Sequence, residues 1–238
     1  MGESGQVSVS AGSGSVKTAF DDRGLYFSHD DEISTPHYYS AVLRSSESAS
    51  DSILKAELSS KSRASDIRFS FTNNDENYAV VQATRRGILG QVDVNPSKRE
   101  ITGFNPERQD SNLGPFTAND FKGYFVAQFD HEFESWGTAH GSTLYPKAES
   151  GQGSELSAYV TFGSGVKVVN VRVGVSFISI EQARQNIVNE LPSRTTVEDT
   201  SLAVESIWAQ KLDAIQLTNA TADESAIFFT AMYHALQV

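Results

Sequence analysis

The spacing of apolar residues changes once along this chain, near Phe177, and this change constrains the fold more than any other feature. Before Phe177 the apolar residues recur in short bursts or at every second position, separated by turn residues, as in strands with one buried face. After Phe177 they recur at the helical spacing of about 3.6 residues. The pattern therefore predicts a mainly β protein, an antiparallel β-sandwich followed by C-terminal helices.

The strand signals come as neighbouring antiparallel hairpins rather than as β-α-β units. In residues 66–71 the alternation is strict, which predicts one face in the core and the other in water. Residues 95–98 and 163–165 carry the turn formers that join neighbouring strands. The clearest predicted strands are residues 38–44, 53–59, 66–71, 78–82, 87–93, 100–104, 122–129, 157–162 and 166–177.

Three helices are predicted after the change of period. Ser179 is the predicted N-cap of the first, which Pro192 ends. The third begins after Thr221 and its pattern continues to the last residues, with a broad apolar face that needs a partner, so we expect a sequence truncated at both ends. The second, over residues 197–215, has an apolar stripe of Val204, Ile207, Trp208, Leu212 and Ile215.

The predicted organisation has three parts. Residues 1–19 are rich in Gly and Ser and are expected to be a flexible or remnant N-terminus. Residues 20–178 are the β-sandwich domain, incomplete at its start, and residues 179–238 are a helical linker with the first helices of a truncated second domain. The start of the chain lacks the basic and apolar segments of a secretory signal peptide, so the chain as written is expected to be cytosolic.

Charge and composition exclude several classes of partner and chemistry. A formal net charge of −11 opposes binding to nucleic acid and to anionic membrane surfaces. No apolar run is long enough to span a bilayer. There are no cysteines, which excludes disulfides and thiolate metal sites, and the common hydrolase, nucleotide and zinc motifs are absent.

The densest polar group is His29 to Glu32, where three consecutive carboxylates follow a histidine. Such a group could bind a hard cation or sugar hydroxyls, because oxygen-rich sites suit Ca²⁺. Its spacing matches no known metal loop, and adjacent carboxylates between a loop and a strand are more often solvated or capping groups. His29 and Glu32 are therefore candidates for substrate binding, and no metal ligand is assigned.

Two further groups are candidates for sugar contact. Residues 130–136 combine Asp130, Glu132 and Glu134 with Trp136, and paired carboxylates near an aromatic platform are typical of a sugar site. In an extended strand the three carboxylates point the same way, so the alternative is an ordinary solvated face. Tyr233 and His234 on the last helix could hydrogen-bond a ligand, although a lone helical histidine is more often a packing residue.

Three stretches of the chain together resemble glycoside hydrolase family 92, the calcium-dependent exo-acting α-mannosidases. The first, residues 27–40 followed by 55–58 and Arg63, is similar to the family's "FSHxxExAxPGYYxVxL…AELTAT…R" segment, with His37 where the family has Gly. Residues 63–67 also depart from the family pattern, which has Gly-His there. The second stretch, residues 101–104 and 124–129, resembles a "GY…YFVAEF" pair of strands.

The third stretch is the most specific. Residues 173–186, then Trp208, Leu212 and residues 228–234, resemble the junction "VGISFVSxExAxxN…W…L…FYTALYHxL". All three stretches stand in the family's order and extend from about residue 22 to residue 236.

The resemblance implies a galactose-mutarotase-like antiparallel β-supersandwich followed by the beginning of an (α/α)6 barrel. It implies inverting hydrolysis by a carboxylic acid and a carboxylate base on opposite faces of the sugar. In the family the acid, the base, the calcium ligands and a Trp-Asp-Thr motif come from barrel segments that follow the "LYH" helix. No catalytic residue and no cofactor is therefore expected within this chain.

The first hypothesis is that the chain is a fragment of an α-mannosidase that trims mannose from N-glycans of glycoproteins. Its partners would be mannose-containing glycans, bound through the complete enzyme, and the missing catalytic domain. The resemblance also implies a parent protein that is often secreted. The alternatives are a stand-alone carbohydrate-binding β-sandwich and an interaction module whose barrel is a separate polypeptide.

Overall fold

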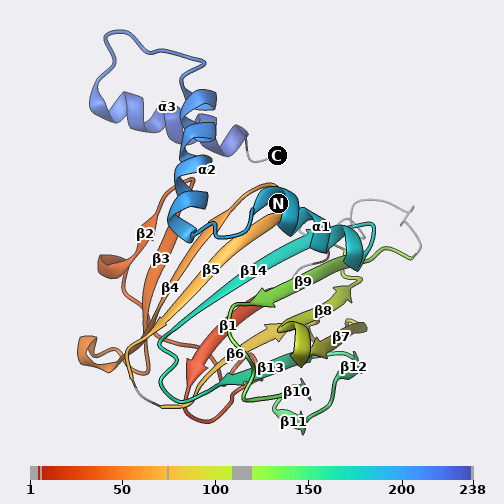
Figure 1. Cartoon of the computed structure of the whole chain (residues 1–238). Coiled ribbons are helices and arrows are strands. Elements are labelled where there is room, and N and C mark those ends of the chain that lie inside the picture. Colours follow the sequence, from red (N-terminus) through yellow and green to blue (C-terminus); the bar gives the residue numbers. More distant parts are fainter. Residues whose placement is uncertain (1–4, 6, 74, 109–119, 237–238) are drawn as a thin grey trace.

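The structure is a computed structural model that describes residues 5, 7–73, 75–108 and 120–236. Two antiparallel sheets pack face to face, and three helices follow them (Figure 1). The mainly β fold with C-terminal helices is thus confirmed. Among the described residues no helix is both long enough and apolar enough to cross a membrane.

The smaller sheet has five strands in the order β1-β6-β13-β10-β11, and the larger has nine in the order β12-β7-β8-β9-β14-β5-β4-β3-β2. The strands are β1 (Ser8–Ser13), β2 (Ile33–Ser34), β3 (Tyr39–Arg44), β4 (Ser52–Ser60), β5 (Ala64–Phe71), β6 (Asn77–Gln82), β7 (Gly90–Asn95), β8 (Glu100–Asn105), β9 (Gly123–Phe129), β10 (Ser135–His140), β11 (Thr143–Pro146), β12 (Ser150–Gly153), β13 (Leu156–Phe162) and β14 (Val168–Ser176). Each of the nine predicted strands corresponds to a strand of the structure.

The core lies between the two sheets and is built from alternate positions of their strands. In β14, Val169, Val171 and Val173 are buried, and they pack against aromatic residues such as Phe125. Burying an aliphatic or aromatic side chain of this kind contributes about 1.5–3 kcal/mol to folding. The sandwich therefore has a continuous apolar core of its own.

Part of the predicted flexible lead-in over residues 1–19 belongs to the sandwich, whereas residues 1–4 and 6 of that segment lie outside the described residues. Residues 8–13 form β1, which pairs with β6 along its whole length. Val16 then packs against Tyr78 and Tyr159 on the outer face of the five-stranded sheet, and the buried Thr18 hydroxyl donates to the carbonyl of Gly141 at 2.6 Å. Tertiary pairing thus orders a Gly/Ser-rich sequence whose local pattern is weak.

Strands β10, β11 and β12 also lay outside the predicted set. Their sequences contain Gly, Ser, Thr and His with little apolar alternation. Strands β11 and β12 are edge strands with little buried surface, and β10 lies next to the edge, between β13 and β11. Residues 130–134 form the connection between β9 and β10 rather than an extended strand. Asp130, Glu132 and Glu134 therefore do not share a strand face, although all three are exposed, as in the solvated alternative.

The helices are α1 (Ile180–Glu190), α2 (Val197–Leu212) and α3 (Ala222–Ala235). Ser179 caps α1 as predicted, accepting from the backbone of Gln182. Helix α1 lies on the outer face of the nine-stranded sheet, directly over Gly174 of β14, where an added Cβ would come within 2.2 Å of the Ala183 carbonyl oxygen. The glycine thus permits close packing of helix on strand.

Helix α2 contacts the sheet only near its N-terminus, and α3 extends away from the sandwich (Figure 1). Val197, Thr200 and Val204 are buried, whereas Ile207 is 49% exposed. Within the predicted apolar stripe Val204 is therefore fully buried, Trp208 and Leu212 are half-buried, and Ile207 and Ile215 are exposed. The predicted boundary at residue 178 lies in the bend between β14 and α1. That this bend separates two domains stays a prediction.

Candidate functional site

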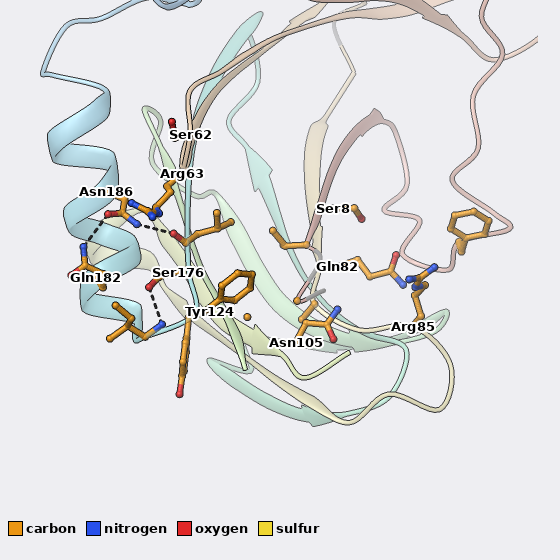
Figure 2. A pocket seen from close by; sticks show the side chains of 18 of the residues that line it. Ser8, Ser62, Arg63, Gln82, Arg85, Asn105, Tyr124, Ser176, Gln182 and Asn186 are labelled. Atoms are coloured by element: carbon orange, nitrogen blue, oxygen red, sulfur yellow. Dashed lines mark hydrogen bonds between the residues drawn. The ribbon is translucent and has the colours of Figure 1, made fainter. Parts of the chain in front are cut away.

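A cavity of about 940 Å³ opens at one end of the sandwich, beside the passage from β14 into α1 (Figure 2). Its walls come from the start of β1, the ends of β6, β8 and β14, the start of β9, and the first half of α1. Ligand pockets in proteins typically enclose about 300–1,000 Å³. This volume and its place at the junction of sandwich and helices make the cavity the candidate site.

The three stretches that carry the family resemblance meet at this cavity. Arg63 comes from the first stretch, Tyr124 from the second, and residues 175–178 with Gln182 and Asn186 from the third. These segments are distant in sequence and become neighbours only through the β5-β14-β9 pairing and the packing of α1. The resemblance thus corresponds to one place in the fold.

Side-chain amides order the wall that α1 contributes (Figure 2). Gln182 donates to the Asn186 carbonyl oxygen at 2.9 Å, and Asn186 donates to the backbone carbonyl of Val175 at 2.8 Å. The Ser176 hydroxyl accepts from the backbone N–H of Ile178 at 3.0 Å. These bonds fix the end of β14 against α1, so the wall is built before any ligand arrives.

The charges around the cavity are of one sign. Arg23, Arg63 and Arg85 line it, and none of the described lining residues is Asp, Glu or Lys. This contrasts with the whole chain, whose net charge is −11. The cavity residues were not predicted as site residues, because more than six separate segments supply them, and the motifs among those segments indicated the family without indicating a site.

A polar layer on the outer face of the nine-stranded sheet fixes α2 on that sheet. Glu57, only 5% exposed, accepts from Arg68 Nε at 2.7 Å and Nη2 at 2.8 Å, and from the Tyr38 hydroxyl at 2.6 Å. Arg68 in turn donates to Glu198 of α2 at 3.1 and 2.5 Å. Hydrogen bonds from Arg68 above all, then from Tyr38 and Lys55, lower the pKa of Glu57 to about 2.

A second set of contacts in this layer joins β5 and β14 to the helices. The Thr200 hydroxyl of α2 donates to the buried Asp66 at 2.5 Å, and burial raises the pKa of Asp66. Arg172 lies 3.4 Å from Asp66 and donates to the carbonyl of Thr195 at 2.8 Å. Glu190 of α1 accepts from the backbone N–H groups of Arg63 and Ala64. The helices are thus positioned relative to the cavity.

His29 and Glu32 lie in an exposed turn away from the cavity. Their side chains contact each other, with His29 Nδ1 and Glu32 Oε2 2.5 Å apart, and hydrogen bonds from His29 and then Tyr39 lower the pKa of Glu32. The neighbouring Asp31 pairs with Arg44. Both carboxylates therefore have partners within the chain, as capping groups do, and a role for His29 and Glu32 in substrate binding stays a prediction.

Trp136 differs from the exposed platform that was expected. On β10 it pairs across from Val160 of β13, and the side chain packs against the main core. Its Nε1 is buried and has no hydrogen-bond partner among the described residues. The register of β10 turns this residue inward, so the expected exposure is wrong, and a contact between Trp136 and substrate stays a prediction.

The loop around Asp130 and His131 lines a smaller hollow of about 430 Å³, which is distinct from the large cavity. Asp130 accepts from the backbone and side chain of Asn170 at 2.9 and 2.6 Å. Because β9 begins at the large cavity and ends beside Asp130, the two hollows lie at opposite ends of that strand. The structure therefore does not bring this loop to the cavity.

Tyr233 and His234 lie on α3, away from the cavity. The Tyr233 ring contacts Trp208 of α2, with ring centroids 4.9 Å apart, and His234 is exposed. Their part in substrate binding stays a prediction. In the described part of the chain no three His, Asp or Glu side chains are grouped as metal ligands.

Two family models match the chain in sequence order. The glycosyl hydrolase family 92 N-terminal domain model matches residues 1–176, and the family 92 catalytic domain model matches residues 182–238. A search of curated proteins found no match.

Solved structures share the fold. The family GH92 inverting mannosidase BT2199 from Bacteroides thetaiotaomicron has a TM-score of 0.84 and 25% identity, over 97% of this chain and 29% of that protein. The GH92 α-mannosidase BT3965 from the same organism has a TM-score of 0.76 and 22% identity, over 96% of this chain and 31% of that protein. A bacterial glucoamylase complexed with acarbose shares the fold alone, with a TM-score of 0.55 and 6% identity over 87% of this chain and 32% of that protein.

The chain spans less than a third of the length of these solved structures. The N-terminal domain model nevertheless covers most of it, and the catalytic domain model covers the helices that follow. The residues that first indicated the family also meet at one cavity of the fold. The chain belongs to glycosyl hydrolase family 92.

Proposed function

We propose that this chain is the N-terminal domain and the beginning of the catalytic domain of an inverting α-mannosidase that trims mannose from N-linked glycans. The two family models in their order support this proposal, as does the similarity to a mannosidase described as inverting. A further GH92 structure with a TM-score of 0.76 is a complex with mannoimidazole, which supports mannose as the sugar that the complete enzyme binds.

Within that enzyme the present segment contacts the glycan and positions the helical domain, rather than transferring protons. Inverting hydrolysis needs a carboxylic acid and a carboxylate about 6.5–9.5 Å apart on opposite faces of the sugar. The described residues that line the cavity include no carboxylate. The acid, the base and the calcium ligands are therefore assigned to the remaining part of the catalytic domain.

The observation that carries this division of labour is the place of the cavity at the junction between the two matched segments. Val175 and Ser176 belong to the first match, whereas Gln182 and Asn186 belong to the second, and all four line the same wall. A glycan bound there would touch both parts of the enzyme.

The test is release of mannose from an α-1,2-linked mannobiose by the 238-residue chain, with a full-length inverting mannosidase of the family as positive control. The chain is expected to release no mannose under conditions in which the control enzyme does. A comparable rate would contradict the assignment of the acid and the base to other segments.

The second candidate is a carbohydrate-binding module without catalytic function, and the size and location of the cavity favour it as a specific alternative. The two are distinguished by a longer polypeptide that continues from residue 238 through a complete family 92 catalytic domain. Mannose release from a high-mannose glycoprotein by that polypeptide supports the enzyme, whereas binding without release supports the module.

A further inference from the structure

Two of the three guanidinium groups at the cavity have no carboxylate partner among the described residues. The half-buried Arg23 donates to the Gln82 amide oxygen and to the Thr18 carbonyl, both of them neutral. The Arg63 backbone is fixed by Glu190 and Val175, whereas no hydrogen bond from its exposed side chain is found among the described residues. A cation partly withdrawn from water, as Arg23 is, is ordinarily paired with an anion. The exposed guanidinium of Arg63 is instead accessible to a ligand in the cavity.

Arg85, the third arginine at the cavity, differs from Arg23 and Arg63 because it is paired with a carboxylate. Its Nε and Nη2 donate to the two carboxylate oxygens of Glu107 at 3.1 and 2.8 Å. This two-point pair neutralises Arg85, and Glu107 does not itself line the cavity. The uncompensated positive charge therefore belongs to Arg23 and Arg63.

The free hydrogen-bond donors of the cavity also favour an anionic ligand. The amides of Gln82, Gln182 and Asn186 are largely used within the wall: Gln82 accepts from Arg23 and donates to the Thr84 carbonyl, and the other two form the chain to Val175. A guanidinium has five N–H donors and no acceptor. Arg63 keeps all five and Arg23 keeps those beyond its two bonds, so the cavity is rich in donors and suits a ligand rich in acceptors.

The rim of the cavity is apolar and exposed. Phe20, Phe177 and Ile178 are 75%, 69% and 75% exposed, and the Phe177 ring lies 5.3 Å from that of Phe121. Ligand sites combine such apolar surface with a few placed polar groups. A sugar ring, with an apolar face and polar edges, matches this combination.

We propose that the cavity binds a saccharide that carries an anionic group, with the guanidinium groups of Arg63 and Arg23 recognising the anion and the rim contacting the sugar ring. The saccharide part rests on the proposed function, and the anionic part rests on the charges of the cavity. Because the chain as a whole carries a net charge of −11, positive charge at this one site favours an anion there over the rest of the surface.

The experiment is calorimetric titration of the chain with four probes: mannose, mannuronic acid, mannose 6-phosphate and inorganic phosphate. The first three share one ring and differ only in the group at C6. We expect either anionic sugar to bind about ten-fold or more tightly than mannose, because hydrogen bonds to charged groups are the stronger ones. We also expect inorganic phosphate to bind more weakly than mannose 6-phosphate, since it cannot contact the rim.

A pair of variants locates the site. Arg63→Gln removes an exposed guanidinium that makes no hydrogen bond or ion pair with the described residues, so folding should be unchanged, as checked by circular dichroism. It should weaken binding of the anionic sugars about ten-fold and leave mannose binding nearly unchanged. Arg86→Gln is the matched control: Arg86 follows Arg85 in the chain, is paired with Glu155 at 3.3 Å and does not line the cavity.

Equal binding of mannose and both anionic sugars would overturn the inference while leaving the proposed function intact. Binding of inorganic phosphate as tight as that of mannose 6-phosphate would also overturn it, because the sugar would then make no contribution. An equal effect of Arg63→Gln and Arg86→Gln would place the anion outside the cavity. The proposed function is instead tested by turnover, so the two failures are distinguishable.

Discussion

Glu57 carries a charge at a buried position on the outer face of the nine-stranded sheet, and four hydrogen bonds from side chains compensate it. Its ordinary pKa of 4.5 falls to about 2 in the folded chain. A carboxyl whose pKa is lower in the folded state stabilises folding fully above pH 4.5, and that stabilisation is lost as the pH falls toward 2. Asp66 acts in the opposite direction, because burial raises its pKa.

Glu57→Gln should lower the free energy of unfolding at pH 7 by about 1–3 kcal/mol, because it removes the buried one of the two carboxylates to which Arg68 donates and leaves only Glu198 as a charged acceptor. The dependence of stability on pH between 4.5 and 2 should also become shallower. Urea unfolding across this pH range measures both effects.

Glu155→Gln is the control for that experiment, because the Glu155 pair with Arg86 is exposed. It should change the free energy of unfolding by less than about 0.5 kcal/mol. Equal losses of unfolding free energy in Glu57→Gln and Glu155→Gln would show that the burial of Glu57 does not increase its contribution to stability.

Gly174 is a second residue whose identity is set by its neighbours. Gly174→Ala should lower the free energy of unfolding by about 1–3 kcal/mol, because the new Cβ would lie 2.2 Å from the Ala183 carbonyl oxygen and 2.7 Å from Ile187 Cγ1. Gly24→Ala is the control, since nothing lies within 4 Å of a Cβ there. Chemical denaturation of both variants makes the comparison, and equal stabilities would contradict the close packing of α1 on β14.

At the scale of elements, the packing of α2 on the sheet decreases from its N-terminus to its C-terminus. Its N-terminal turn has a capping box between Thr196 and Asp199 and packs on the sheet, whereas its second half is held mainly by the ring contact between Trp208 and Tyr233. Helix α3 has no buried residue. Elements with few buried contacts open at low free energy.

Hydrogen exchange should therefore show strong protection in α1 and early α2, and weak protection in α3. Trp208→Ala should reduce protection in α3 several-fold further, because it removes the main contact with α2, while leaving β14 unchanged. Mass spectrometry of exchanged peptides measures this. Equal protection of α1 and α3 in the unmodified chain would contradict the difference in docking.

At the scale of the whole molecule, the sandwich buries its own core and the later helices leave apolar side chains in water. Exposed patches of this kind promote association. Ile227 on α3 is 72% exposed, whereas Ile187 on α1 is 2% exposed. Isoleucines on α1 and α3 thus have opposite environments.

Ile227→Lys should change the free energy of unfolding by less than about 0.5 kcal/mol and should reduce self-association in sedimentation velocity. Ile187→Ala should instead cost about 2–5 kcal/mol, because it leaves a cavity between α1 and the sheet. A large loss of stability in Ile227→Lys would show that α3 is packed against the rest of the chain in solution.

The amino-acid sequence by itself determined the nine predicted strands, the three helices, the change of architecture near Phe177, the N-cap at Ser179 and the start of the third helix after Thr221, because these depend on periodicity and on neighbouring residues. Motifs at several distant positions also sufficed to indicate the family. Such local signals survive without any knowledge of the contacts between distant segments.

Only the tertiary structure decided the rest. It placed β1 on β6, turned Trp136 inward, separated the Asp130 loop from the candidate site, and gathered Arg23, Arg63 and Arg85 at one cavity. Each of these depends on strand register and sheet order, which pair residues far apart in the chain and which local alternation does not specify. The physical reason is that a one-residue shift in register exchanges the two faces of a strand, so the site exists only once the sheets have paired.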